Sequence, residues 1–182
     1  MIAVPKTKFN IFVIGESLVG KTCIIKSFCK QAFKYDEFPT VCLENFKTPM
    51  TYDNIEYQFK FFDISGKDKY KKIVSPKFRL ADGFIYVFSI DNTDSLNKID
   101  KWIQLVDEST KIKKKKILIG NKIDITKREI ANETALNFAK ERNMKYFEVS
   151  AKTGYRIEDT ISSFCKELYE SNKQLENQKK SE

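Results

Sequence analysis

The segment from Gly15 to Thr22 combines residue types and spacing that suit phosphate binding. Its sequence, GESLVGKT, fits the pattern G-x-x-x-x-G-K-[ST] and lies between a strand-like apolar run and a helix-like pattern. The glycines let the backbone wrap around a phosphate, and successive N–H groups and a helix N-terminus meet its charge. Lys21 offers a point charge to the β and γ phosphates, and the Thr22 hydroxyl suits Mg²⁺. The ligand contacts predicted here are Ser17, Leu18, Val19, Gly20, Lys21, Thr22 and Cys23.

A second candidate, Asp63-Ile64-Ser65-Gly66, follows another strand-like run. A carboxylate at Asp63 can hold a metal ion through water, and Gly66 can offer its N–H to a γ phosphate. Taken alone, D-x-x-G is most often an ordinary turn. Its position after the phosphate-binding segment favours the functional interpretation.

A third candidate, Asn121-Lys122-Ile123-Asp124, directly follows the apolar run at 116–120. The Asp124 carboxylate is an acceptor-only group, so it can take both the ring N–H and the exocyclic amine of guanine. Adenine lacks that donor pair and would leave Asp124 unpaired, which is costly. The Lys122 stem can lie over the base. A capped helix start is an equally common explanation of such a tetrapeptide by itself.

The tripeptide Ser150-Ala151-Lys152 follows a further short apolar run. Its backbone N–H groups can meet the guanine oxygen, although the tripeptide alone is weak evidence. Together the four segments predict a guanine nucleotide, GTP or GDP, bound with Mg²⁺.

Strand-like and helical patterns alternate along the chain and would position these segments. We expect strands at 9–14, 46–52, 56–62, 83–90, 116–120 and 146–149, and helices from Lys21 to Ala32, around Ile99 to Val106 and from Ile157 to Leu168. Pro49 marks the second strand as an edge strand. Such alternation predicts an α/β fold with a six-stranded, mostly parallel sheet, one antiparallel edge strand and about five flanking helices. Residues 1–175 would form this domain, and 176–182 a polar, frayed tail.

Composition narrows the possible functions. The 182 residues contain four cysteines without a C-x-x-C pair and no histidine, which disfavours a zinc site, a disulfide framework and Ser-His or Cys-His catalysis. Free thiols suit the cytoplasm. The net charge of +8 hints at nucleic acid or an acidic membrane, but the densest basic run, Lys113 to Lys116, lacks interleaved aromatic residues. We expect that run to be a solvated loop, and no nucleic-acid partner.

The ordered set GESLVGKT, Pro39-Thr40, DISG, NKID and SAK resembles the Ras superfamily of small GTPases, from about Phe9 to Leu168. The fold that this resemblance implies is the P-loop NTPase G domain. The segment from Phe78 to Gly83 and the interval from Thr40 to Asp63 are similar to the Rab branch, whereas Phe88 to Asp91 looks more like Rho. The chain is therefore identified as an atypical, Rab-like member.

The resemblance implies further roles. Thr40 would close over Mg²⁺ and the γ phosphate, completing a metal set with Thr22 and Asp63. Phe33 would pack edge-on against guanine, although a plain hydrophobic contact also explains it. Residues 36–45 and 66–78 would form the two switches, through which effectors, exchange factors and GTPase-activating proteins act.

The chain departs from the family after D-x-x-G, where Lys67 replaces the glutamine that orients the attacking water. A lysine is donor-only and cannot accept a hydrogen bond from water. The expected catalytic set is therefore Lys67, doubtful in that role, with Lys21 and Gly66, and hydrolysis should be slow. The last residues contain no cysteine for a prenyl group, so we expect no direct lipid anchor. We expect a monomer that is peripheral to endomembranes through a partner.

Two functions remain open. The first is a GTPase that cycles between its GTP and GDP states, serving vesicle trafficking or signalling. The second is a GTP-locked or non-hydrolysing domain that acts only as a protein-binding module, which Lys67 favours. An ATP-dependent kinase is a distant third, and tighter binding of ATP than of GTP would reveal it.

Overall fold

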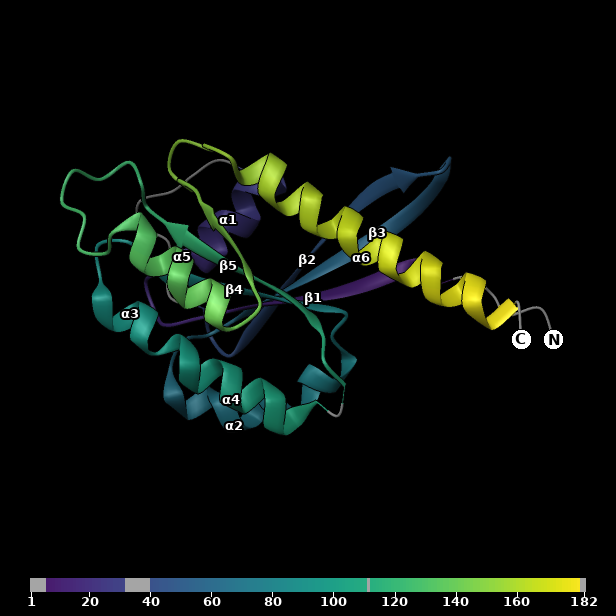
Figure 1. The fold of residues 1–182 in the computed structure, drawn as a ribbon, viewed down its shortest axis with the longest axis horizontal. Helices are drawn as coiled ribbons and strands as arrows, with labels where there is room; N and C mark the ends of the chain where they lie inside the picture. The colour runs from purple at the N-terminus through teal and green to yellow at the C-terminus, as the bar shows by residue number, and fades with distance from the viewer. Residues whose placement is uncertain (1–5, 32–39, 111, 181–182) are drawn as a thin grey trace.

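The computed structural model describes residues 6–31, 40–110 and 112–180, and in these the chain forms one six-stranded sheet. The strand order is β2-β3-β1-β4-β5-β6 (Figure 1). The pair β2·β3 is antiparallel and every other neighbouring pair is parallel, which confirms the predicted fold class. The strands are β1 Lys8–Ile14, β2 Leu43–Tyr52, β3 Ile55–Ile64, β4 Gly83–Ser89, β5 Lys115–Asn121 and β6 Lys145–Glu148.

Helices cover both faces of the sheet. One face packs against α1 and α6, and the other against α2 to α5. The helices are α1 Lys21–Phe28, α2 Asp68–Val74, α3 Thr93–Asn97, α4 Ile99–Ser109, α5 Asn132–Glu141 and α6 Ile157–Lys180, with a 3₁₀ helix at Ser75–Leu80.

Strand β1 shows how the sequence supplies both cores. Its side chains alternate, so Ile11 and Val13 pack towards α1 and α6, while Phe12 and Ile14 pack towards the opposite layer. All four side chains are fully buried or nearly so. Burying a side chain of this size contributes about 1.5–3 kcal/mol. The continuous apolar run that predicted a doubly covered strand therefore has its expected cause.

The edge strand is confirmed as well. Strand β2 lies at the border of the sheet and contains Pro49, whose missing N–H would interrupt a central strand. Asp53 and Asn54 turn the chain into β3 with φ of 49° and 60°. Two consecutive residues in this left-handed region match the twist of a tight hairpin.

The helix predicted from Lys21 to Ala32 ends earlier, at Phe28. Lys30 adopts a φ of 59°, and the N–H groups of Lys30 and Gln31 bond back to Ser27 and Lys26. This pattern is a Schellman motif, which normally has glycine at the left-handed position, so a lysine there does not predict the end of a helix. Ala32 itself lies outside the described residues.

The tail expected to fray after Leu175 instead continues as helix to Lys180. Asn172 donates to the Glu176 carboxylate at 2.7 Å, and the backbone N–H of Lys6 donates to that carboxylate at 3.1 Å. These contacts hold the last turns against the start of the chain, and Figure 1 shows both termini at the same end of the molecule. Among the described residues, no helix is both long and apolar enough to cross a bilayer.

Candidate functional site

The segment Gly15–Gly20 connects β1 to α1 at the carboxyl end of the sheet. Gly20 caps the helix with a φ of 95°, and a Cβ there would lie 2.2 Å from the Asn121 amide nitrogen. Only glycine fits this conformation and this space. Helix α1 begins directly after Gly20, so its first backbone N–H groups, which have no acceptor within the helix, lie at the loop where an anion can meet them.

Lys21 is 6% exposed, and its ammonium folds back over the loop. It donates to the carbonyl oxygens of Gly15 at 3.1 Å and Glu16 at 2.7 Å. Burial lowers the pKa of Lys21 to about 8, and the charges of Asp63 and Glu16 partly oppose that shift. A buried ammonium held mainly by neutral carbonyls is well placed to receive a phosphate oxygen.

Thr22, Thr40 and Asp63 come together from three different elements. The Thr22 hydroxyl lies 3.0 Å from that of Thr40, and the two hydroxyls donate to Oδ2 of Asp63 at 2.5 and 2.7 Å. This is the trio that the sequence and its resemblance assigned to the metal. Hydroxyl and carboxylate oxygens are the ligands that Mg²⁺ takes in proteins.

The second carboxylate oxygen of Asp63 shows how well the trio fits a cation. Asp63 is fully buried, and its Oδ1 accepts no hydrogen bond from the described part of the chain. Burial raises the pKa of Asp63, although the hydroxyls of Thr22 and Thr40 and the charge of Lys21 oppose this. A buried carboxylate with an unused oxygen calls for a positive partner, and a hydrated Mg²⁺ fits.

Gly66 brings the start of the second predicted switch onto the phosphate loop. A Cβ at this position would lie 2.2 Å from the Ser17 backbone nitrogen, so only glycine allows this approach. Lys67, the next residue, is exposed and precedes α2. Its side chain makes no hydrogen bond or ion pair with any described residue, so the structure places Gly66 at the site but leaves Lys67 facing solvent.

The predicted base-recognition segments meet through side-chain hydrogen bonds. The Asn121 amide donates to the Val19 carbonyl at 2.9 Å and accepts from the Ala151 N–H at 3.0 Å. The Ser150 hydroxyl donates to Oδ1 of Asp124 at 2.6 Å. Three loops that lie far apart in the sequence are thereby tied into one rim.

Two lysines predicted at the rim lie beside carboxylates. The Lys122 ammonium is 3.5 Å from Asp91, and that of Lys152 is 4.0 Å from Asp124. Lys122 has a φ of 71°, a strained conformation for a lysine. Strain of this kind is typical of functional loops.

The remaining predicted residues divide into placed and unplaced ones. Val19 is buried, Cys23 is half-buried, and Ser17 and Leu18 are exposed at the loop, Leu18 with a φ of 66°. Phe33 and residues 36–39 of the predicted first switch lie outside the described residues.

Glu16 is a site residue that the sequence interpretation missed. Its carboxylate accepts from the Trp102 indole N–H at 3.2 Å and lies 3.5 Å from the Lys98 ammonium and 3.6 Å from that of Lys71. An acidic residue inside a phosphate-binding loop is electrostatically unfavourable unless it is turned away and paired. An acidic residue at this position of the sequence was therefore the feature that could have predicted a paired Glu16.

The arrangement as a whole matches how open α/β sheets bind ligands. The phosphate loop, Asp63, the Asn121–Asp124 segment and Ser150 lie at or directly after the carboxyl ends of β1, β3, β5 and β6. Loops at that edge converge, so residues distant in sequence share one crevice.

Comparison of the sequence with known proteins agrees with this arrangement. The sequence profile of the Ras family matches residues 10–170. The chain is 28% identical over 161 residues to Ras-related protein Rab-13 of Canis lupus familiaris, covering 88% of this chain and 79% of that protein. It is 32% identical over 155 residues to Rab-15 of Homo sapiens, covering 85% and 73%. It is 28% identical over 166 residues to Rab-18 of Lymnaea stagnalis, covering 91% and 82%. With a profile match over most of its length and the motif residues gathered at one sheet edge, the chain belongs to the Ras family and is a Rab-like small GTPase.

Proposed function

We propose that the chain is a molecular switch that binds GTP or GDP with Mg²⁺ at the crevice described above and hydrolyses GTP slowly. The observation that carries this proposal is the hydroxyl–carboxylate cluster of Thr22, Thr40 and Asp63, all within 3.0 Å of one another, beside the buried Lys21. The two hydroxyls and the carboxylate are hard oxygen ligands, and one buried oxygen of the carboxylate has no hydrogen-bond partner among the described residues. This combination suits a cation such as Mg²⁺.

The phosphates would lie against the loop at 15–20. Backbone N–H groups of the loop and of the α1 N-terminus bind their oxygens, and Lys21 exchanges its carbonyl partners for them. Thr22, Thr40 and Asp63 hold the metal. Bound Mg²⁺ neutralises the charge that develops on the phosphates during transfer.

Guanine would lie at the rim formed by the Asn121–Asp124 and Ser150–Lys152 segments. The Ser150 hydroxyl occupies Oδ1 of Asp124 and fixes the orientation of the carboxylate. Guanine then offers two donors to this fixed acceptor, whereas adenine offers no such pair. Asn121 couples the rim to the phosphate loop, so base and phosphates are recognised by one connected unit.

Slow hydrolysis follows from Lys67. Its ammonium can stabilise charge on the γ phosphate, but it cannot accept a hydrogen bond from the attacking water. We expect an unassisted rate of about 10⁻⁴ s⁻¹ or below, the range of unassisted members of this family. A partner that supplies an arginine would accelerate the reaction.

Loss of the γ phosphate would release Thr40 and Gly66, so the segments 36–45 and 66–78 would change conformation together. Effectors, exchange factors and GTPase-activating proteins would read that difference. By likeness to its Rab relatives, the chain would serve vesicle trafficking or signalling as a cytoplasmic monomer that reaches endomembranes through a partner.

One observation favours a second function, that of a non-hydrolysing binding module. The Lys67 side chain is exposed, and no described residue holds it where a water-orienting group must lie. Steady-state hydrolysis measured with and without cell extract separates the two functions. Acceleration by extract supports the cycling GTPase, and its absence supports the module.

The binding part of the proposal is tested by identifying the nucleotide carried by the purified protein and by replacing Asp124. Chromatography of the extracted ligand should show GDP or GTP. The Asp124→Ala variant loses an acceptor for two donors, so its Kd for GDP should rise by about a hundredfold or more. Glu56→Ala, an exposed carboxylate at the start of β3, is the matched control and should bind normally. Unchanged GDP affinity in Asp124→Ala refutes the proposal.

A further inference from the structure

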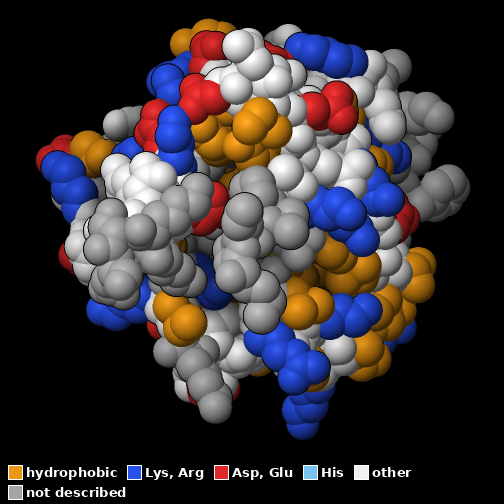
Figure 2. Space-filling model, turned by 90° about the vertical axis from the view of Figure 1, so that its right-hand side faces the viewer, with side chains coloured by type: hydrophobic (Ala, Val, Ile, Leu, Met, Phe, Trp, Pro, Cys, Tyr) orange, Lys and Arg blue, Asp and Glu red, His pale blue; other side chains and the backbone are white. Residues whose placement is uncertain are grey.

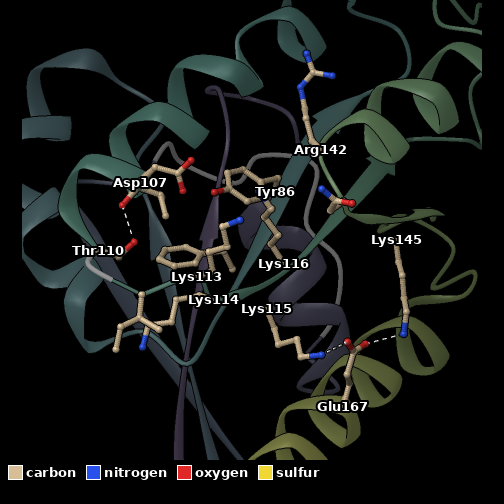
Figure 3. Close-up of a pocket in the computed structure, with 14 residues that line it drawn as sticks. Tyr86, Asp107, Thr110, Lys113, Lys114, Lys115, Lys116, Arg142, Lys145 and Glu167 are labelled. Atoms are coloured by element: carbon tan, nitrogen blue, oxygen red, sulfur yellow. Dashed lines mark hydrogen bonds and ion pairs between the residues drawn. The ribbon is translucent and has the colours of Figure 1, made fainter.

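A cavity of about 710 Å³ opens at the amino-terminal ends of the strands, whereas the candidate nucleotide site lies at their carboxyl ends (Figure 3). It lies at the amino-terminal halves of β4, β5 and β6, below the end of α4. Its volume falls in the range of small-molecule sites. The basic run Lys113–Lys116, which the sequence led us to expect as a plain solvated loop, forms much of its wall.

Most of the charged groups around the cavity are basic, and only some of them are neutralised. Arg142 is held by Asp100 at 2.5 and 2.8 Å. Lys115 and Lys145 share Glu167 at 3.1 and 2.7 Å, and Figure 3 shows them converging on it. The cations that remain available are Lys113, Lys114 and Lys116, whose side chains form no ion pair with any residue that the structure describes.

Lys114 and Lys116 line the cavity and are partly buried, whereas Lys113 is exposed. Asp107, an exposed residue of the same lining, offsets one of the three cations. A concave surface with an excess of lysine ammonium groups and low-dielectric walls concentrates positive potential. Such a surface attracts small anions more strongly than a flat one does.

A buried tyrosine also lines the cavity beside these lysines. Tyr86 is fully buried and lines the cavity, and Figure 3 shows its ring between Asp107 and the lysines. Its hydroxyl makes no hydrogen bond with the described residues. Burial raises the pKa of Tyr86, and Asp107 adds to the shift, so the phenol keeps its proton and remains a donor. A phenol hydroxyl in the lining of a cavity can donate a hydrogen bond to an oxygen of a ligand bound there.

We propose that this cavity binds a small anion carrying several phosphate groups on one ring, as in a phosphorylated inositol. Lys113, Lys114 and Lys116 bind the phosphates as point charges, and the Tyr86 hydroxyl donates to one phosphate oxygen. A nucleic acid does not fit, because Phe84 and Tyr86 are buried and present no stacking face. The site is separate from the nucleotide crevice and does not depend on the function proposed for it.

The same headgroup chemistry occurs in a soluble inositol phosphate and in an inositol lipid. Figure 2 views the molecule from the end at which both termini lie, and Lys and Arg side chains are distributed over this face among hydrophobic ones. Binding to a lipid through the cavity would turn this part of the surface towards the membrane. The carboxyl ends of the strands, where the candidate switches lie, would then face away from the membrane and towards protein partners. The experiment has to distinguish the two sources.

Soluble inositol hexakisphosphate is titrated calorimetrically into the nucleotide-loaded protein. Lys113→Gln, Lys114→Gln and Lys116→Gln together should weaken binding at least tenfold, and Tyr86→Phe about fivefold. Tyr86→Phe keeps the buried ring and removes a hydroxyl that forms no hydrogen bond with the described residues, so its Tm should change little. The matched control combines Lys47→Gln, Lys101→Gln and Lys127→Gln, exposed lysines outside the lining, and should bind as the natural protein does.

Flotation with vesicles identifies the source. Vesicles carrying an inositol bisphosphate lipid are compared with phosphatidylserine vesicles of equal total charge. Binding of the soluble anion alone assigns a free metabolite, and preference for the inositol lipid that the triple variant loses assigns a headgroup. The proposal is overturned if neither probe binds, if the control variants lose as much as the cavity variants, or if both kinds of vesicle bind equally. The Tm of each variant reports on folding.

Discussion

The indole N–H of Trp102 donates to Oε1 of Glu16 across 3.2 Å, which joins helix α4 to the phosphate loop. Lys71 of α2 lies 4.4 Å from the centre of the same indole ring and 3.6 Å from the same carboxylate. The loop that would carry phosphate, the second candidate switch and a buried core residue therefore meet at one point. A movement of α2 must change the surroundings of Trp102.

This junction predicts an intrinsic optical signal. Trp102 is the only tryptophan of the chain, so its fluorescence reports on this place alone. Exchange of GDP for a non-hydrolysable GTP analogue should change its emission, because Lys71 moves relative to the ring when α2 responds. The measurement is the emission spectrum before and after exchange. Lys71→Gln should reduce the change, and identical spectra for the two nucleotides in the natural protein would contradict the coupling.

Glu16 should also contribute to stability. Glu16→Ala leaves the buried Trp102 N–H without an acceptor, which should lower the free energy of unfolding by about 1–3 kcal/mol. Glu16→Gln keeps an acceptor oxygen and loses only the partly exposed ion pairs with Lys71 and Lys98, so it should cost less than 1 kcal/mol. Urea denaturation of the GDP-loaded protein measures both. Equal losses in the two variants would assign the effect to charge and not to the hydrogen bond.

Lys67→Gln should accelerate hydrolysis. Glutamine supplies the acceptor that orients water, and Lys67 has no structural partner among the described residues whose loss would confuse the result. We expect the single-turnover rate to rise about tenfold or more. Lys69→Gln, an exposed neighbour on α2, controls for the loss of one charge. A rate that stays constant in Lys67→Gln would show that position 67 does not limit the reaction.

The sheet and the motif residues were predictable from sequence because both depend on local patterns. Alternation and apolar runs reveal strands, and the spacing from Gly15 to Thr22 or from Asn121 to Asp124 encodes a loop geometry by itself. The alternation of strands and helices predicted a mostly parallel sheet, whereas the order of its strands was not predicted. The predicted features need no knowledge of which distant residues meet.

One feature that escaped prediction is local, and the others depend on contacts between distant residues. Helix α1 ends after Phe28 because Lys30, and not the usual glycine, adopts the left-handed conformation. Helix α6 continues because Glu176 is held by the start of the chain. The pairing of Glu16 with Trp102 spans 86 positions. The sequence shows that a run such as Lys113–Lys116 concentrates positive charge, whereas only the tertiary structure shows that the run lines a cavity.

Removal of Mg²⁺ should speed nucleotide release. The metal would satisfy the unpaired Oδ1 of Asp63, and without it the phosphates lose a cation and face that buried carboxylate. Excess chelator should raise the dissociation rate of a fluorescent GDP about tenfold or more. Asp63→Asn lacks the charge and should release GDP quickly with or without chelator. If chelation leaves the rate of the natural protein unaltered, the cluster around Asp63 is not a metal site.

A pH-dependent contribution to stability should come from Glu148 at the end of β6. Burial alone would raise the pKa of its carboxyl, but hydrogen bonds from Arg128 at 3.2 Å and Tyr146 at 2.7 Å outweigh burial and hold the pKa below its ordinary 4.5. The folded state therefore favours the ionised form, so the contribution is present above pH 4.5 and is lost as the pH falls through the lower folded value.

The variant Glu148→Gln isolates this contribution. At neutral pH it should be less stable than the natural protein by about 1–2 kcal/mol, since it keeps one acceptor but loses the charge facing Arg128. The difference should shrink as the pH is lowered below 4.5, where the natural carboxyl also becomes neutral. Urea denaturation across that range measures it, with Glu56→Gln as the exposed control. A difference that stays constant with pH would mean that shape rather than charge explains the loss.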